Sequence, residues 1–254
     1  MPAPTRLSTV HRPSLEVLAE ELVILYQDDD LVVVNKPSGL LVHRGWANDK
    51  ITAVHLVREH TKKKVHPVHR LDRPTSGALL FACSESANKA LNTAFREGRI
   101  EKRYLALVRG ITPEQGAIDN PVPSRPKGPR VEAQSAYWRR STFDRYSLVE
   151  VAPRTGRLHQ VRRHLKHITH PIIGDVNYGK GDQNRLFREK FGLHRMALHA
   201  GLLSFPHPGT SELLTICAPL PNDLTAPFLQ MGLAEPSWQM EDSLVVRPVM
   251  GSVS

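Results

Sequence analysis

Residues 69–77 read His69-Arg70-Leu71-Asp72-Arg73-Pro74-Thr75-Ser76-Gly77, and the apolar run ALLFA follows at 78–82. A charged, turn-forming stretch directly before five apolar residues predicts a polar loop that leads into a buried strand. Within this loop Asp72 lies between Arg70 and Arg73. Two flanking positive charges favour the ionised carboxylate, which suits a nucleophile or a charge stabiliser better than a general acid. A local Asp–Arg ion pair that fixes the loop is the alternative interpretation.

Short strands and helices flank this loop on both sides without a regular alternation. The clearest helix follows Ser84, where Ala87, Leu91 and Ala94 recur at helical spacing before Gly98. Further strands are predicted at 22–26, 31–35, 102–108, 146–151 and 212–216, and further helices at 51–60, at 157–168 and from Asn222 onward. This irregular mixture predicts the α+β class, with a mixed, mostly antiparallel central sheet and flanking helices and loops. We expect one domain at 21–235 between tails at 1–20 and 236–254.

The composition is that of a globular protein. Of 254 residues, 40% are hydrophobic and 23% charged, and no run approaches the roughly 20 apolar residues that cross a bilayer. The two cysteines, Cys83 and Cys217, argue against a disulfide framework and fit a reducing cytoplasm. The 34 Lys and Arg residues outnumber the 25 Asp and Glu residues by nine. This surplus is compatible with a nucleic-acid partner and also with an ordinary soluble basic protein.

Two basic segments add weight to a phosphate-bearing partner. Residues 154–166, RTGRLHQVRRHLK, hold five Lys or Arg residues and no acid, at the start of a predicted helix. Clustered arginines at such a position suit phosphate binding, although a charge run is more often a solvated helix face. Residues 119–130, DNPVPSRPKGPR, predict a proline-rich loop. This loop is basic, because it contains Arg125, Lys127 and Arg130 and only one acidic residue, Asp119.

The sequence gives less support to a metal enzyme, a protein with a nucleotide cofactor or a glycosidase. His164, His167 and His170 are closely spaced, but no cysteine pair or local carboxylate accompanies them, so we expect no metal site. A glycine-rich phosphate loop is missing, so no nucleotide cofactor is expected. A hydrolytic glycosidase needs a second carboxylate beside the first, and between Glu59 and Glu85 only Asp72 is acidic. That spacing weakens the hydrolase interpretation without excluding it.

The combination of HRLDRPTSG (69–77) with GRLHQVR (156–162) resembles the RluA-type pseudouridine synthases. The segments NKPSGLLVH (35–43), KRY (102–104), HPIIGD (170–175) and LHA (198–200) resemble the same family in the same order, and Val161 is a conservative departure from its usual leucine. The resemblance implies the pseudouridine synthase fold, here expected without an S4 RNA-binding domain. VHRGW (42–46) and residues 181–200 are similar to the TruC branch, which modifies uridine 65 of tRNA.

By this resemblance Asp72 is the catalytic aspartate and Arg162 its partner. Tyr104 matches the family tyrosine that stacks on the base and is the candidate for removing the C5 proton. A tyrosine with a pKa of about 10 needs help to act as a base, which we expect the arginine-rich pocket to supply. Arg70 matches the residue that fills the gap left by a flipped uridine. His69 and Ser76 are expected to support the loop, and RNA contacts are expected from Arg157, His159, Arg163, Arg125, Lys127 and Arg130.

The function expected from the resemblance is therefore isomerisation of a specific uridine to pseudouridine, with uridine 65 of tRNA as the leading target. Another tRNA position or ribosomal RNA is the first alternative. A non-catalytic RNA-binding protein on the same scaffold is the second, and the intact set of Asp72, Tyr104 and Arg162 speaks against it. The reaction needs no redox or energy input, so we expect no cofactor, and we expect a cytoplasmic monomer whose partner is RNA.

Overall fold

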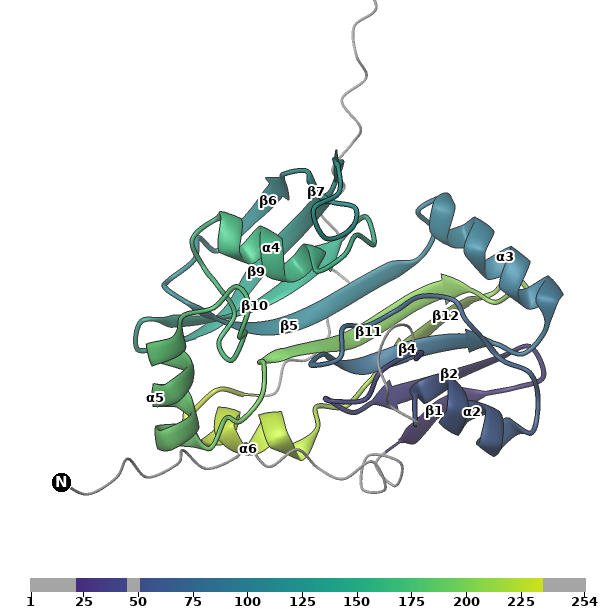
Figure 1. Cartoon of the computed structure of the whole chain (residues 1–254), viewed down its shortest axis with the longest axis horizontal. Helices are drawn as coiled ribbons and strands as arrows, with labels where there is room; N and C mark the ends of the chain where they lie inside the picture. Colours follow the sequence, from purple (N-terminus) through teal and green to yellow (C-terminus); the bar gives the residue numbers. More distant parts are fainter. Residues whose placement is uncertain (1–21, 45–50, 235–254) are drawn as a thin grey trace, which may run out of the picture.

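The computed structural model describes residues 22–44 and 51–234 (Figure 1). The tails expected at 1–20 and 236–254 lie outside the described residues, as do Gly45 and Trp46 of the VHRGW segment. Among the described residues no helix is both long and apolar enough to cross a membrane.

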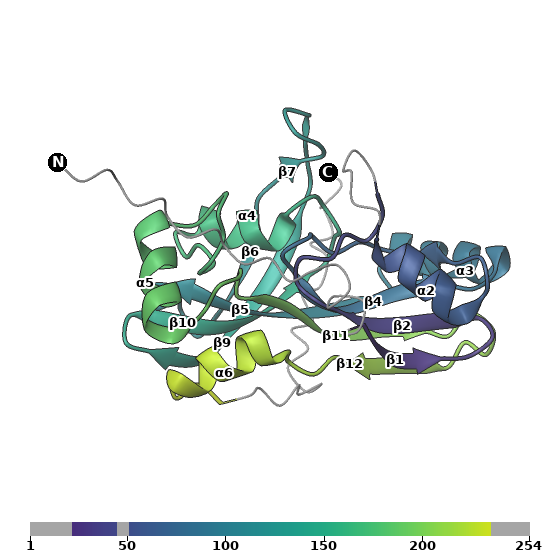
Figure 2. The ribbon, with the colours of Figure 1, turned by 60° about the horizontal axis from the view of Figure 1, so that its bottom comes forward.

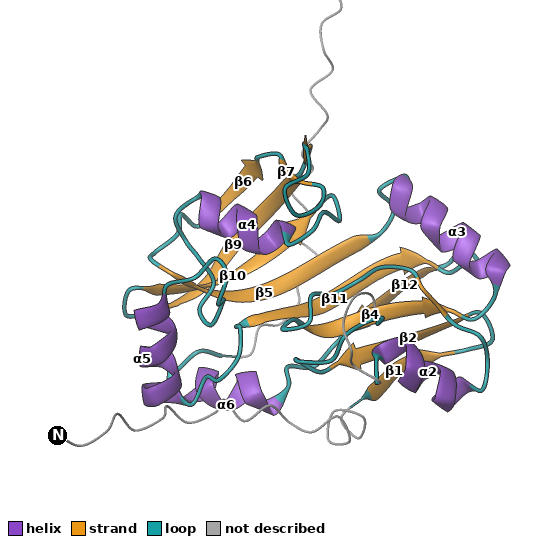
Figure 3. Cartoon of the chain, in the orientation of Figure 1, coloured by secondary structure: helices purple, strands orange, loops and turns teal. Residues whose placement is uncertain are grey.

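A ten-stranded sheet forms the centre of the molecule (Figure 3). Its strands are β1 Val23–Gln27, β2 Leu31–Lys36, β3 His66–Pro67, β4 Ser76–Ala82, β5 Glu101–Arg109, β6 Gln115–Asp119, β9 Gln134–Phe143, β10 Tyr146–Pro153, β11 Leu198–Pro206 and β12 Leu213–Cys217. The spatial order is β1-β2-β4-β11-β5-β10-β9-β6, with β12 paired to β11 and β3 paired to β4. Among these strands every pair is antiparallel except β4 with β11. The predicted α+β class with a mixed, mostly antiparallel sheet is confirmed.

The parallel pair joins two halves of the sheet over only two residues of each strand. Ser76 pairs with His199, and Gly77 pairs with Ala200. Gly77 has φ +119°, and a Cβ built on it would lie 2.2 Å from the carbonyl oxygen of Ala200. Glycine is therefore required at this close approach of two backbones. Because β4 begins at this junction, the polar loop before it lies where the two halves meet.

Helices cover both faces of the sheet. They are α2 Ala53–Thr61, α3 Glu85–Arg96, α4 Gln160–His167, α5 Gly181–Phe191 and α6 Asn222–Gln230. Figure 2 shows α2 and α4 on one side of the sheet, α6 on the other, and α5 at one end. Helix α3 packs with Leu31 and Leu80, whereas α2 packs with Val32 and Phe81, so these two helices cover opposite faces of β2 and β4. A small hairpin of β7 Val122–Pro123 and β8 Arg130–Val131 rises from the face that carries α4. The apolar core follows this layering, because α5 and α6 pack beneath β5 and β10 while α2 and α3 pack against β2 and β4.

Helix α3 forms where the local sequence predicts it. The side chain of Ser84 accepts the N–H of Ala87 at 3.1 Å, which is the N-cap interaction expected of a serine at this position. Ala87, Leu91 and Ala94 are the buried face. Because the cap and the apolar stripe are both local features, the sequence is sufficient to place this helix.

Several elements differ from the prediction. The strands β3, β6, β9 and β11 and the helix α5 were not predicted. β11 shows no alternation because it is buried on both faces, and α5 buries only Phe187 and Phe191. The helix predicted at 157–168 begins at Gln160, and the helix expected to be capped by Asn222 has Pro221 at its N-cap position. The proline-rich segment 119–130 is not all loop, because it contributes to the β7–β8 hairpin.

Candidate active site

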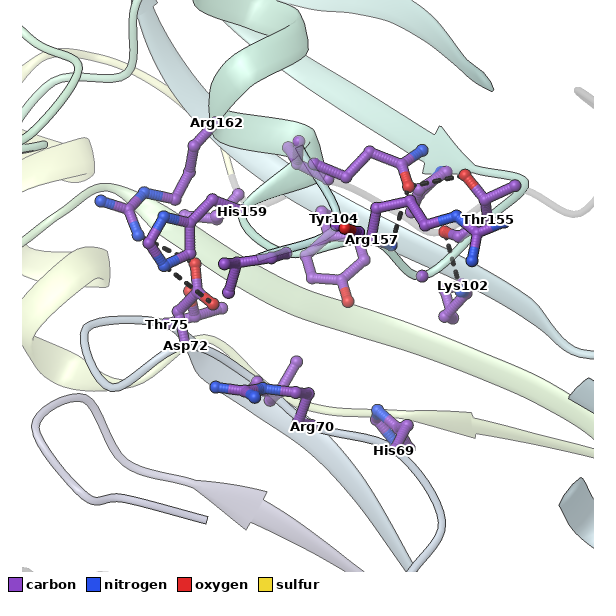
Figure 4. A pocket seen from close by; sticks show the side chains of 18 of the residues that line it. His69, Arg70, Asp72, Thr75, Lys102, Tyr104, Thr155, Arg157, His159 and Arg162 are labelled. Carbon is purple, nitrogen blue, oxygen red and sulfur yellow. Dashed lines mark hydrogen bonds and ion pairs between the residues drawn. The ribbon is translucent and has the colours of Figure 1, made fainter. Parts of the chain in front are cut away.

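A cleft of about 610 Å³ opens over the junction of the two sheet halves. Three parts of the chain form its walls: the loop 68–75 before β4, the residues Lys102 and Tyr104 on β5, and the segment 153–162 that leads into α4. The tip of the β7–β8 hairpin forms part of the rim. Figure 4 shows that charged side chains from all three walls point into this space. The cleft therefore collects residues that are distant in sequence.

Asp72 and Arg162 meet in this cleft although 90 residues separate them. The Arg162 guanidinium donates to Asp72 Oδ2 at 2.9 Å and is itself only 3% exposed. On its other side it donates two bonds to Asp175, at 2.7 and 2.9 Å, and the Asp175 side chain is fully buried. Burial alone would raise the pKa of Asp175, but the hydrogen bonds and charge of Arg162 outweigh it and lower that pKa. Arg162 is thus a fixed cation between two carboxylates.

The buried side chain of Lys36 holds the loop that carries Asp72 by a hydrogen bond to its backbone. Lys36 is fully buried, and its ammonium donates to the carbonyl oxygens of Pro37, Leu40 and Arg73 at 2.7, 2.9 and 3.3 Å. Burial, with a further effect of the Arg195 charge, lowers the pKa of Lys36 well below its usual value. Sequence reasoning gave Lys36 no role, because nothing in NKPSG indicates that its lysine points inward.

A second cation holds the other end of the loop. Arg195 donates to Ser76 Oγ at 2.8 Å and to the carbonyl oxygens of Pro74 and Leu198 at 3.4 and 3.1 Å. Ser76 Oγ in turn lies 2.8 Å from Nδ1 of the buried His199. The segment 69–76 therefore bonds directly to β11 across the parallel junction, as the expected supporting role of Ser76 requires.

His69 supports the same loop from its N-terminal end. Its Nε2 accepts the N–H of Leu80 at 3.1 Å, and burial lowers the pKa of the ring to about 3. The ring is therefore neutral, as an acceptor must be. The expectation that His69 supports the loop is confirmed.

The segment before α4 is closed into a loop by Gln160. Its Oε1 accepts the N–H of Arg157 at 3.0 Å and the hydroxyl of Thr155 at 2.6 Å. Its amide nitrogen donates to the carbonyl oxygen of Gln134 at 2.8 Å. These bonds explain why the helix starts three residues later than predicted. The ring of His159, the residue before Gln160, lies with Nε2 3.8 Å from Asp72 Oδ1.

Tyr104 lies between the Asp72–Arg162 pair and Lys102 (Figure 4). Burial, together with the charge of Asp72, raises the pKa of Tyr104 well above its usual value. The expectation that the arginine-rich pocket would make this tyrosine a better base is therefore wrong for the free protein. Lys102 is buried over the Phe95 ring, donates to the carbonyl oxygen of Thr155 at 3.3 Å, and has a pKa lowered by burial to about 8.

A carboxylate held by a buried arginine can act as a nucleophile or charge stabiliser, and the aromatic side chain and cations around it suit a nucleic-acid base and its phosphates. The profile of the family described as RNA pseudouridylate synthase matches residues 30–167. A protein from Haemophilus ducreyi named tRNA pseudouridine synthase C is 43% identical over 84% of this chain and 96% of its own length. The chain belongs to the RNA pseudouridylate synthase family.

Further members of the family are similar over most of their length. The Vibrio cholerae protein named tRNA pseudouridine synthase C is 41% identical over 78% of this chain and 91% of its own. The solved structure of human RNA Pseudouridylate Synthase Domain Containing 4 has a TM-score of 0.71 at 26% identity, covering 88% of this chain and 97% of the human one. This chain is thus an RNA-modifying isomerase with the pseudouridine synthase fold.

The residues expected to contact RNA divide into three groups. Arg70, Arg125, Arg157 and His159 all line the cleft of this pseudouridine synthase. Lys127 and Arg130 are exposed on the β7–β8 hairpin, outside the cleft lining. Arg163 turns inward, where it donates to Tyr178 Oη at 2.9 Å and to the carbonyl oxygen of Pro123 at 3.1 Å. Arg163 therefore supports the hairpin and α4.

Two of the three histidines considered as metal ligands, His164 and His170, have other partners. His164 Nδ1 lies 2.9 Å from Ser135 Oγ, and its Nε2 lies 3.0 Å from the carbonyl oxygen of Asn120. His170 Nδ1 lies 2.9 Å from the carbonyl oxygen of Arg109. Within residues 22–44 and 51–234, no group of three His, Cys, Asp or Glu side chains is arranged to hold a metal ion.

Proposed function

We propose that this pseudouridine synthase isomerises a uridine of tRNA, and that the target is uridine 65. The observation that supports tRNA is the 43% identity, over 96% of its length, with a relative named tRNA pseudouridine synthase C. Position 65 rests on the similarity of residues 181–200 to the TruC branch. Action on tRNA would place the protein in the cytoplasm.

In the reaction the bond between C1′ and N1 of the uridine breaks, the base turns, and a bond between C1′ and C5 forms while the C5 proton leaves. We assign the first step to Asp72. Its Oδ2 accepts a hydrogen bond from Arg162. Its other oxygen, Oδ1, faces the cleft, and the nearest basic side-chain nitrogen to it is His159 Nε2 at 3.8 Å. Oδ1 is thus the oxygen free to act on the ribose as nucleophile or base.

Tyr104 then serves to stack on the uracil and orient it. Its position beside Asp72 places a flat side chain against the base of any ribose that Asp72 reaches. Its raised pKa makes it a poor proton acceptor in the free enzyme. Loss of the C5 proton to Tyr104 therefore requires that bound RNA first change the surroundings of the hydroxyl.

The uridine must leave its helix to reach Asp72, because the carboxylate lies inside the cleft. Arg70 is exposed at the cleft and is positioned to occupy the vacated stack. Arg157 and Arg125, which also line the cleft, would hold the flanking phosphates.

The test uses tRNA transcript that carries tritium at C5 of its uridines. Wild-type protein should release tritium and convert position 65, mapped by carbodiimide treatment and primer extension, whereas Asp72→Asn should release none. Asp182→Asn, which removes an exposed carboxylate of α5, should behave like wild type. Conversion at another position would move the target, and equal release by Asp72→Asn would remove Asp72 from the mechanism. Release from ribosomal RNA alone would replace tRNA as the substrate.

A further inference from the structure

Tyr178 is surrounded by the cations of α4. Its ring lies 5.0 Å from the Arg162 guanidinium, 5.8 Å from that of Arg163 and 5.6 Å from the ammonium of Lys166. Its backbone N–H donates to Asp175 Oδ1 at 3.1 Å. The carboxylate that fixes Arg162 therefore also fixes Tyr178, behind the residues that line the cleft.

The Tyr178 hydroxyl connects Arg163 to His159. Its oxygen lies 2.9 Å from Arg163 Nε and 3.0 Å from His159 Nδ1. The other ring nitrogen of His159, Nε2, lies 3.8 Å from Asp72 Oδ1. A line of polar contacts thus runs from Arg163 through Tyr178 and His159 to the catalytic carboxylate.

The backbone of His159 is held in an uncommon conformation. It has φ +54° and ψ +28° at the N-cap of α4, and its side chain makes no capping hydrogen bond. Left-handed backbone is unfavourable for residues other than glycine, and N-caps are ordinarily Ser, Thr, Asp or Asn. Because His159 is strained and does not cap the helix, it is a candidate for a functional role. We assign that role to its imidazole ring, which this backbone conformation places beside Asp72.

The positions of the protons follow from the chemistry of the partners. Burial lowers the pKa of His159 despite the opposing charge of Asp72, so the ring is neutral and carries one proton. The Nε–H of Arg163 can only donate, so Tyr178 Oη accepts it and is free to donate its own proton to His159 Nδ1. Nε2 then carries the ring proton toward Asp72, which can only accept. The other tautomer would set the lone pair of Nε2 against the carboxylate.

We propose that Tyr178 is a positioning residue that holds His159 as the Nε2–H tautomer, so that this N–H directs Asp72 Oδ1 during catalysis. The inference rests on the proposed role of Asp72. In the free protein the 3.8 Å separation exceeds a hydrogen bond, and such contacts tighten when substrate binds. Arg162 on Oδ2 and His159 on Oδ1 would then fix the carboxylate in one plane.

The first test reads the tautomer directly, without activity. Protein labelled with ¹⁵N at histidine gives long-range ¹H–¹⁵N spectra in which the two neutral tautomers differ, and His159→Gln identifies the signal. Wild type should show His159 protonated at Nε2 alone. Tyr178→Phe, which keeps the ring over the arginines and removes only the hydroxyl, should show a mixture of tautomers. A proton on Nδ1 in wild type, or an unchanged spectrum in Tyr178→Phe, would overturn the proposal.

The second test separates positioning from RNA binding. Tyr178→Phe should lower kcat for tritium release about tenfold and change KM for the RNA less than twofold. In a His159→Ala background the same substitution should have no further effect, because the link to Asp72 is already broken. Tyr146→Phe, which removes a tyrosine hydrogen bond to Gln183 on α5, is the matched control and should keep wild-type kcat.

Either of two results would contradict a positioning role: additive losses in the double variant, or a rise in KM with kcat unchanged. If wild type releases no tritium from any RNA, the proposed function fails, whereas the tautomer assignment is still decided by the spectra.

Discussion

At the scale of single residues, the site depends on two carboxylates that share one arginine. Asp72 and Arg162 could be named from the motifs that carry them. Asp175 is the last residue of the segment HPIIGD (170–175), and nothing in that segment indicates that it binds Arg162. A pairing of this kind depends on how α4 packs against the loop 174–178, which no local pattern encodes.

Asp175→Asn should destabilise the fold far more than Asp72→Asn. Removing the fully buried Asp175 leaves Arg162 a buried cation with half of its partners, which costs about 3 kcal/mol. Asp72 is 15% exposed, and its replacement should cost below about 1 kcal/mol while it abolishes activity. Urea unfolding of both variants measures the difference. Equal stabilities would show that Arg162 is satisfied without Asp175.

The contribution of Asp175 also has a defined pH dependence. Its pKa is lowered in the folded protein, so its stabilisation is complete above the unfolded pKa of about 4 and is lost as pH falls through the lowered folded value. Wild type should therefore lose stability more steeply in acid than Asp175→Asn. Parallel acid-unfolding curves would contradict this.

Lys102 should make RNA binding sensitive to alkaline pH. With a pKa of about 8, it loses its charge between pH 7 and pH 9 within the cleft wall. We expect KM for the RNA to rise several-fold across that range. Lys102→Arg keeps its charge and should show a flat profile, whereas Lys102→Met should show a raised KM at both ends. A rise of equal size in Lys102→Arg would assign the titration to another group.

At the scale of elements, the sequence predicted the helices and strands whose caps and apolar pattern lie within the element itself. It did not predict those whose position depends on contacts with residues distant in sequence. Helix α3 has its cap and apolar stripe within 84–98, so it was found. β11 carries no alternation because it is buried on both faces, between β4 and β5. α4 was placed too early, since its start is fixed by the bonds of Gln160 to Gln134 and Ser135, distant in sequence.

The parallel junction of β4 with β11 should be the element least tolerant of change. Gly77→Ala places a Cβ 2.2 Å from the Ala200 carbonyl oxygen, in a φ region unfavourable for alanine, so the strands must separate. We expect a destabilisation of more than about 3 kcal/mol in urea unfolding, with loss of activity. Gly98→Ala is the matched control, because it also has positive φ but no atom within 4 Å. Its cost should be about 1–2 kcal/mol, from backbone strain alone.

At the scale of the whole molecule, the cleft is formed by the meeting of two sheet halves. Asp72 comes from the half that contains β1, β2 and β4, and Arg162 from the half that contains β5, β10 and β9. The surplus of nine positive charges was compatible with a polyanionic partner but could neither identify that partner nor locate its binding surface. The structure supplies a candidate surface, because the β7–β8 hairpin projects beside the cleft on the face that carries α4 (Figure 2).

The hairpin should supply a measurable share of the salt dependence of RNA binding. Arg125, Lys127 and Arg130 are all exposed on it, and removing one cation that neutralises a phosphate lowers the slope of log Kd against log salt by about 0.7–0.9. Replacing all three by glutamine should weaken tRNA binding at least tenfold and reduce that slope by about two.

The matched control replaces Arg185, Arg188 and Lys190, three exposed cations of α5, and removes the same net charge at one end of the sheet. Because a nearby cation matters more than net charge at physiological salt, where screening acts within about 8 Å, the control should change the slope little. Equal slopes in the two triple variants would mean that the overall charge, and not the hairpin, attracts the RNA.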